Sequence, residues 1–165
     1  MIYFTGWTNT DGRVMSVRTR TFSAPTTIDS VPAARRRARS ELAGCGLNIE
    51  HPVLGAALVV FSELVTNSVV HAAGHSSHFS VTITVRPGTL VIAVHDRHPH
   101  VPGLRPESAG HDDCNGRGLN LVAHLSAEAG GHAETVPDPD GGGKTIRASL
   151  PLPAEARSPD GATGL

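Results

Sequence analysis

The chain has 165 residues, 39% of them hydrophobic and 18% charged, with a formal net charge of −1 at pH 7. These values are typical of one globular domain with its own core, and they exclude a disordered chain or a general polyanion-binding surface. The 4% aromatic share disfavours an RNA-stacking surface, and Cys45 and Cys114 are too far apart for a zinc ribbon, so we interpret them as free thiols.

The N-terminus shows neither the basic stretch nor the long apolar run of a secretory signal. The longest apolar run, residues 53–61, is much shorter than the ~20 residues of a membrane-spanning helix. We therefore expect a cytoplasmic protein with no membrane role and a flexible N-terminus over residues 1–11.

The first half of the chain predicts a strand and two helices. β-branched residues alternate roughly over residues 13–22, which indicates a strand at the edge of a sheet. Ser30 and a proline in the next turn are typical of a helix start, and this helix is expected over residues 33–43. Residues 49–74 predict a longer helix whose apolar side chains surround so much of its surface that it belongs in the interior.

The second half predicts two hairpins separated by a loop and a helix. The loop shows no regular apolar pattern, and loops of this length in compact domains are usually functional or mobile. In order, the predicted elements are a hairpin of strands 79–85 and 90–94, the loop over 97–115, a helix that opens at 116–118, and a closing hairpin of strands 133–136 and 144–150.

This order of elements predicts the fold class. Consecutive strands form hairpins, so all the helices can lie on one face of the sheet. We predict an α/β fold, a two-layer sandwich with a mixed, mostly antiparallel sheet, over residues 12–150. Residues 151–165 are rich in Pro, Ala and Gly, and we expect them to form a disordered tail.

Polar side chains recur along the longer predicted helix. Glu63, Asn67 and His71 stand at i, i+4 and i+8 and therefore share one helix face. Burying a carboxylate and an amide is costly unless they are paired, so the stripe indicates a bound ligand or metal. A solvent-facing stripe explains the same spacing equally well.

Two further positions are candidates for ligand contacts. Asp96 comes directly after the hydrophobic strand 90–94, where the chain leaves the sheet, although an isolated Asp there often only starts a turn. Gly116, Arg117 and Gly118 open a helix, and backbone N–H groups at a helix N-terminus suit phosphate. The two glycines could equally well just end a flexible loop.

These features occur in one order: E-L-V-T-N-S-V-V-H-A, a strand ending V-H-D, a loop with G-R-G-L, and G-G-G-K-T-I-R-A-S-L. In this order the chain resembles the Bergerat-fold (GHKL) ATPases over roughly residues 12–150. Among them it is most similar to the stand-alone bacterial anti-sigma regulatory factors, which are serine protein kinases.

The resemblance implies a role for each motif. Glu63 would orient or deprotonate the attacking hydroxyl, and Asn67 would give its amide oxygen to Mg²⁺, which prefers oxygen ligands. Asp96 would accept a hydrogen bond from the adenine amino group of ATP, with help from the hydroxyl of Thr145. The loop over 97–115 would be the ATP lid. The phosphates would be held by Gly116, Arg117 and Gly118.

One motif departs from the family pattern. The first glycine box of the family reads D-x-G-x-G, whereas residues 96–100 read Asp-Arg-His-Pro-His and contain neither glycine. Bulky side chains and a proline at this point could weaken ATP binding or leave a pocket that binds without turnover.

The resemblance implies an ATP-dependent serine kinase that sequesters a sigma factor and phosphorylates an antagonist protein. The alternative is a protein-binding module in which nucleotide is structural or absent, which the altered glycine box favours. A histidine kinase catalytic domain ranks third, because we expect no room for a dimerising helical hairpin with an acceptor histidine. A homodimer is compatible with the family.

Two other clusters have competing interpretations. A metal site could be drawn from His95, His98 and His100 together with His111 and Asp112, but their spacing matches no zinc pattern and solvated histidines explain them better. The basic face of the first helix is a solvated face by default. If this face is functional, we expect it to contact a protein partner rather than DNA. The face consists of Arg35, Arg36, Arg37 and Arg39.

Overall fold

The computed structural model describes residues 3–8, 14–104 and 117–157. Its centre is a six-stranded sheet with the strand order β1-β2-β3-β4-β6-β5. The five strand pairs that the structure describes are all antiparallel, so these strands form a wholly antiparallel sheet where we expected a mixed, mostly antiparallel one. The strands are β1 (Tyr3–Thr8), β2 (Val14–Pro25), β3 (His78–Arg86), β4 (Thr89–Asp96), β5 (His132–Pro137) and β6 (Lys144–Pro151).

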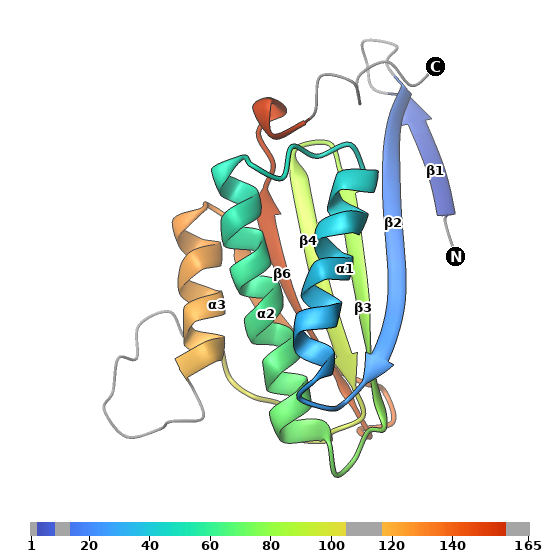
Figure 1. Cartoon of the computed structure of the whole chain (residues 1–165), viewed down its shortest axis with the longest axis vertical. Coiled ribbons are helices and arrows are strands. Elements are labelled where there is room, and N and C mark those ends of the chain that lie inside the picture. The colour runs from blue at the N-terminus through green and yellow to red at the C-terminus, as the bar shows by residue number, and fades with distance from the viewer. Residues whose placement is uncertain (1–2, 9–13, 105–116, 158–165) are drawn as a thin grey trace.

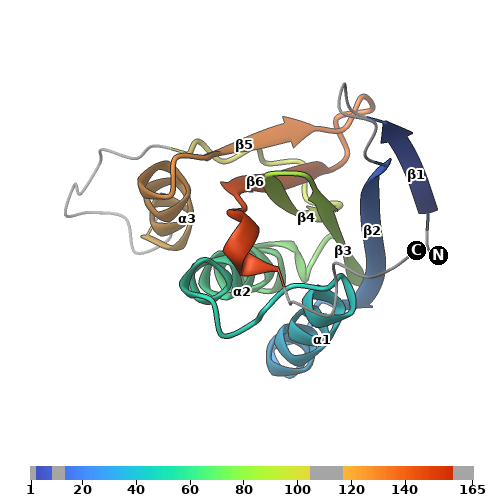
Figure 2. The same cartoon turned by 90° about the horizontal axis from the view of Figure 1, so that it is seen from above.

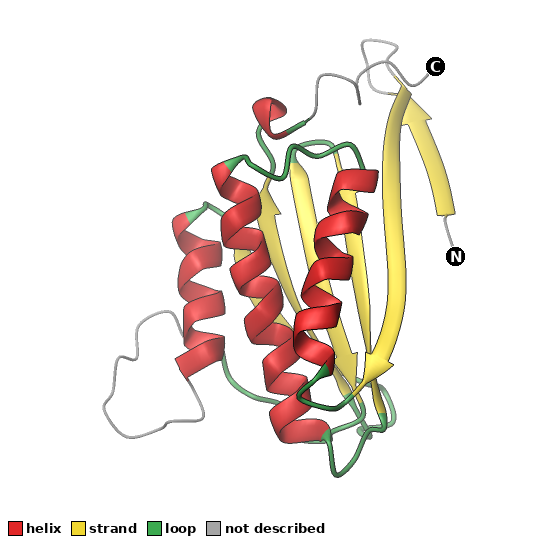
Figure 3. Cartoon of the chain, in the orientation of Figure 1, coloured by secondary structure: helices red, strands yellow, loops and turns green. Residues whose placement is uncertain are grey.

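Three helices cover one face of this sheet, as Figures 1 and 2 show. They are α1 (Ser30–Gly44), α2 (Pro52–Ala72) and α3 (Arg117–Glu128). Colouring by secondary structure separates a helix layer from a strand layer (Figure 3). The predicted two-layer α/β sandwich is therefore confirmed, and so are both hairpins and the three helices.

Helix α2 lies at the centre of the helix layer. It begins at a proline, which fits the first helical position, and the ring of His51 accepts a hydrogen bond from the backbone N–H of Val53 over 3.3 Å. By length and composition α2 could cross a membrane, but 56% of its most apolar window is buried inside the domain. Here it is a core helix, packed between α1, α3 and the sheet.

Alternation in the strands explains how polar groups reach the core. In β4 the buried positions are Leu90, Ile92, Val94 and, at the end of the row, Asp96. In β6 the buried row runs from Leu150 back to Lys144, which is paired in register with Asp96. Side chains that alternate toward one face therefore place a carboxylate and an ammonium group side by side at the same end of the core.

Both ends of the chain differ from the sequence-based expectation. Residues 3–8, predicted to be flexible, form β1 beside β2, so β2 is not an edge strand. Backbone pairing with an existing edge demands little of the sequence, which explains why no pattern indicated this strand. Past residue 151, Leu152 and Ala156 are buried and Arg157 forms a β-bridge with Leu47, so the tail is packed up to residue 157. Residues 158–165 of the predicted tail lie outside the described residues.

Candidate nucleotide-binding site

The first residue of the stripe on α2, Glu63, lies against the first turn of α3. The side chains of Glu63, Asn67 and His71 are all half-buried. A Cβ on Gly118 would come within 2.5 Å of Oε2 of Glu63, so only a residue without a side chain lets that carboxylate lie against the start of α3. The first N–H groups of a helix lack partners within the helix and carry the positive end of its dipole. Glu63 therefore borders a position suited to a metal ion and an anion, and Asn67 follows one turn along the same face of α2.

Asp96 is held inside the domain by three donors. Its Oδ1 accepts hydrogen bonds from Nζ of Lys144 over 2.8 Å and from the backbone N–H of His98 over 3.0 Å. Its Oδ2 accepts one from Oγ of Ser68 over 2.6 Å. The side chains of Asp96 and Lys144 are only 1% and 2% exposed. The carboxylate is therefore satisfied by the protein itself.

Sequence reasoning missed Ser68 and Lys144, although both follow from simple periodicities. Ser68 comes four residues after the buried Leu64 and so lies on the core side of α2. Lys144 comes two residues before the buried Ile146 and so faces the core in β6. A polar residue at such a position must find a buried partner, and for both of them the partner is Asp96.

The expected contribution of Thr145 is corrected by the strand register. Thr145 is paired with His95 of β4 and with Val136 of β5, whereas Asp96 is paired with Lys144. Because successive side chains of a strand point to opposite faces, Thr145 lies on the sheet face away from the helices and from Asp96. The structure does not bring the two residues together.

A profile of the family described as "Histidine kinase-like ATPase domain" matches residues 24–150, which include α1, α2, α3, the complete strands β3, β4 and β5, and all of β6 except its last residue. The chain belongs to this family. The resemblance to the GHKL ATPases is thereby confirmed, and membership implies ATP binding, usually with Mg²⁺.

Two relatives from Mycobacterium tuberculosis are each 31% identical to the chain over 107 residues. One, from strain H37Rv, is named "Sensor histidine kinase component HK1", and the match covers 57% of this chain and 60% of the relative. The other, from strain CDC 1551, is named "Probable sensor histidine kinase HK", and the match covers 57% of this chain but 26% of the relative. The chain thus matches only part of each relative.

The two ends of the ATPase site differ in how well they fit Mg²⁺·ATP. At one end, the carboxylate of Glu63, the amide of Asn67 and the start of α3 at Gly118 supply the oxygen donors and the positive helix end that a metal and phosphates need. At the other end, which we call the base end, Asp96 would accept a hydrogen bond from the adenine amino group in the family pattern. Here Lys144 already occupies that carboxylate, so the base end does not fit this pattern.

The segment after Asp96 begins with Arg97, which stands beside the two missing glycine positions and is held by ion pairs. Arg97 donates from Nη1 to Oδ2 of Asp138 and from Nη2 to Oδ2 of Asp140, each over 2.9 Å. Oδ2 of Asp138 also lies 2.9 Å from Nε2 of His95. The β5–β6 turn thereby fixes the start of the predicted lid.

The histidine near the base end packs against a second histidine. The ring of His98 meets the ring of His75 edge-on, with centroids 4.4 Å apart. Burial lowers the pKa of His98, and the nearby charges of Lys144 and His75 lower it further. Among the described residues no group of three His, Cys, Asp or Glu side chains could hold a metal ion. Of the metal site considered from sequence, His111 and Asp112 lie outside those residues.

Parts of the predicted phosphate-binding loop also lie outside the described residues, namely Gly116 and residues 105–115 of the lid. Arg117, the first residue of α3, is exposed, and Gly118 is half-buried. The structure therefore places two of the three residues predicted to hold the phosphates.

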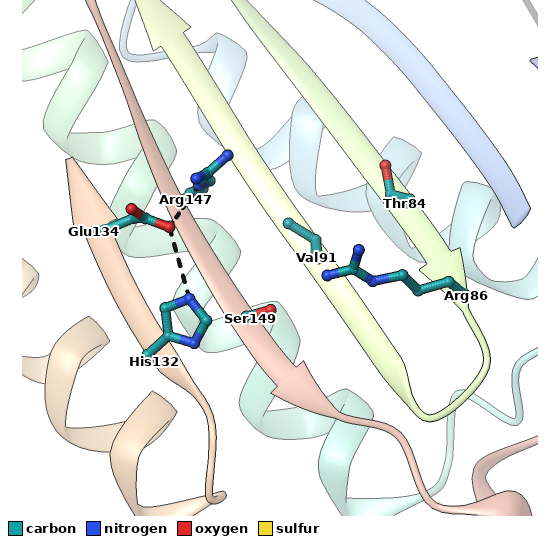
Figure 4. A pocket seen from close by; sticks show the side chains of 7 residues that line it. All are labelled: Thr84, Arg86, Val91, His132, Glu134, Arg147 and Ser149. Atoms are coloured by element: carbon teal, nitrogen blue, oxygen red, sulfur yellow. Dashed lines mark hydrogen bonds and ion pairs between the residues drawn. The ribbon is translucent and has the colours of Figure 1, made fainter. Parts of the chain in front are cut away.

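A cavity of about 360 Å³ lies on the opposite face of the sheet (Figure 4). In it, Arg147 donates from Nε to Oε1 of Glu134 over 2.7 Å, and Nε2 of His132 lies 3.6 Å from the same oxygen. The hydrogen bond from Arg147 holds the pKa of Glu134 below its usual range. The strand register puts this cavity across the sheet from Asp96, so it is no part of the ATPase site.

The basic face of α1 is largely used within the domain. Each of three arginines has a partner close by, so these side chains are less available to an outside ligand than the sequence indicated. The contacts are Arg35 with Ser62, Arg37 with Glu41 and with the ring of Phe22, and Arg39 with Glu50.

Proposed function

We propose that this domain binds ATP with Mg²⁺ and transfers a phosphoryl group to a protein serine, as an anti-sigma regulatory factor of the kinase type. One observation carries the proposal: the carboxylate of Glu63 lies against Gly118 at the start of α3. A carboxylate at the phosphate-binding helix can take the proton of an attacking hydroxyl. The bound Mg²⁺·ATP would supply the phosphoryl group.

Each residue of this end has a separate task. Asn67, one turn along α2 from Glu63, offers an uncharged oxygen to the metal and adds no negative charge beside the phosphates. The backbone N–H groups at the start of α3 offset the charge of the phosphates. Glu63 positions and deprotonates the acceptor hydroxyl. Phosphoryl transfer depends mainly on such positioning and charge neutralisation.

The proposed acceptor is a serine of a small antagonist protein. The proposed partner, which the domain would hold or release, is a sigma factor. Both proposals imply a domain that works in the cytoplasm. The order of motifs along the chain supports this class. The relatives named as sensor histidine kinases point instead to a histidine acceptor on another protein, and the experiment below separates the two by the chemistry of the product.

A second candidate is a regulatory module that associates with its partner without turnover. The buried ion pair between Asp96 and Lys144 favours it, because this pair takes up the carboxylate that would hold the base. The ion pairs of Arg97, at the altered glycine box, favour it too.

The test is transfer of label from γ-³²P-ATP with Mg²⁺ to the soluble proteins of the source organism, prepared without this protein. Wild type, Glu63→Gln and the matched control Glu50→Gln, at an exposed and distant position, are compared. We expect one labelled protein with wild type and the control, and none with Glu63→Gln. Phosphoserine survives acid and is lost in alkali, whereas phosphohistidine is lost in acid.

An acid-labile product would replace serine by histidine as the acceptor. If no protein were labelled in a way that depends on Glu63, and this domain formed a stable complex with another protein, the second candidate, a regulatory module without turnover, would be favoured.

A further inference from the structure

We propose that Lys144 determines the base preference of the nucleotide site and removes its preference for adenine. This inference rests on the proposed function, because it concerns the base of the same nucleotide. It starts from the only buried pair of opposite charges recorded for the described part of the chain, Nζ of Lys144 and Oδ1 of Asp96, 2.8 Å apart.

A lone carboxylate at the base end would favour adenine because it can only accept hydrogen bonds. Adenine presents an amino group at the edge where guanine presents a keto oxygen. A buried carboxylate without another donor would therefore gain a bond from adenine and repel the guanine oxygen. This selection requires that the carboxylate be free.

In this chain the carboxylate is not free. Asp96 accepts hydrogen bonds from Lys144, Ser68 and the backbone of His98, so three of its roughly four acceptor sites are used. An adenine amino group would have to displace one of these donors or share an oxygen with them, and its net gain would be small.

The ammonium group of Lys144 also cancels the negative charge of Asp96 at the base end of the site. Nζ of Lys144 has three protons; one is donated to Asp96, and another points to the carbonyl oxygen of His98, 3.4 Å away. The carboxylate and ammonium together are neutral and can both accept and donate. A site of this kind can form a hydrogen bond with either an amino group or a keto oxygen, so it should not distinguish adenine from guanine.

The segment that follows β4 covers the pair. His98 donates its backbone N–H to Asp96 and lies near Lys144 through its carbonyl oxygen, and its ring packs on His75. Both charged side chains are almost fully buried beneath it.

The test compares the affinities of AMP-PNP and GMP-PNP, both with Mg²⁺, by calorimetry of the full chain. For wild type we expect the two dissociation constants to agree within about tenfold, the factor that one neutral hydrogen bond provides. Lys144→Thr removes the ammonium group beside Asp96 and opens space there, while the donors Ser68 and His98 remain, so we expect its preference for AMP-PNP to rise by at least about tenfold. Lys144→Arg keeps the charge and should keep the wild-type ratio.

The outcomes separate this inference from the proposed function. A wild-type preference for AMP-PNP above about a hundredfold, or a ratio unchanged by Lys144→Thr, would overturn the role of Lys144 while the nucleotide site stands. Failure of wild type and variant to bind either analogue at millimolar concentration would overturn both. Because Lys144→Thr leaves a buried carboxylate without its cation, its fold is checked by circular dichroism, and the wild-type ratio tests the inference without any variant.

Discussion

The carboxylate of Glu63 and the α-carbon of Gly118 lie so close that a Cβ on Gly118 would come within 2.5 Å of Oε2. The obstructing atom is the end of a flexible side chain, so Gly118→Ala should displace the carboxylate and leave the fold intact. We predict that this variant loses most phosphoryl transfer, as Glu63→Gln does. Its unfolding temperature should stay within about 4 °C of wild type.

The matched control is Gly55→Ala, on the exposed side of α2, where a Cβ would have no neighbour within 4 Å. Replacing a helical glycine by alanine should stabilise the domain by about 0.5–1 kcal/mol and leave transfer unchanged. If Gly118→Ala transferred phosphate at the wild-type rate, the close approach of the two residues would have no part in catalysis.

The ion pair between Asp96 and Lys144 should also contribute to the stability of the fold. Asp96→Ala leaves a buried ammonium group without its partner, and we predict a loss of about 3–5 kcal/mol in the free energy of unfolding. Urea denaturation of both proteins measures this difference. For the exposed pair Arg39–Glu50, the variant Glu50→Ala should lose less than about 1 kcal/mol. Equal losses in the two variants would contradict the structural role of the buried pair.

Stability should fall on mild acidification because of His98. Burial, Lys144, His75 and His100 all lower the pKa of His98, and only Asp96 opposes them. The unfolded chain therefore takes up this proton near pH 6.5 and the folded domain only at lower pH. The stabilisation is complete above this value and is lost as the pH falls below it.

The measurement is the urea midpoint at about pH 7.5 and about pH 5.5, a window set by the ordinary pKa of histidine. The variant His98→Gln should show a smaller decrease than wild type, whereas His124→Gln, at an exposed position on α3, should match wild type. The depressed pKa values of Glu134 and Asp140 place their titration below this window. A decrease that His98→Gln leaves unaltered would assign the pH dependence to other groups.

The strand register separates Thr145 from the site and includes Ser68 in it. Thr145→Val should change nucleotide affinity by less than about twofold, because its side chain lies across the sheet from Asp96. Ser68→Ala removes a donor to a buried carboxylate and should cost about 1.5–3 kcal/mol of stability. Calorimetry and urea denaturation measure the two effects. A tenfold loss of affinity in Thr145→Val would return this residue to the site.

Much of the fold could be predicted because local patterns and tertiary structure agree. The alternation in strands 79–85 and 90–94, with a Pro-Gly turn between them, leaves few alternatives to a hairpin, and Gly88 adopts the positive φ that the turn requires. The apolar circumference of α2 likewise indicated a buried helix. Strand β1 lacked any such pattern, because it joins the sheet through its backbone.

The sequence predicted which residues belong to the candidate site, but not which of them contact one another. Spacing placed Glu63 and Asn67 on one face of α2, but the contact with Gly118 depends on how two helices pack. Lys144 and Thr145 are neighbours in sequence, and only the register of β6 shows which of them faces Asp96. The ion pairs of Arg97, next to the altered glycine box, join residues more than 40 positions apart, which no local pattern reveals.

The most direct test of the central claim is a calorimetric titration of Mg²⁺·AMP-PNP into wild type and Asn67→Ala, with Thr145→Val as the control. We predict binding to wild type and to the control, and a loss of at least about tenfold in the affinity of Asn67→Ala, a difference that vanishes when Mg²⁺ is omitted. Equal affinity of wild type and Asn67→Ala, or no binding to wild type at millimolar nucleotide, would contradict a nucleotide site at Glu63, Asn67 and the start of α3.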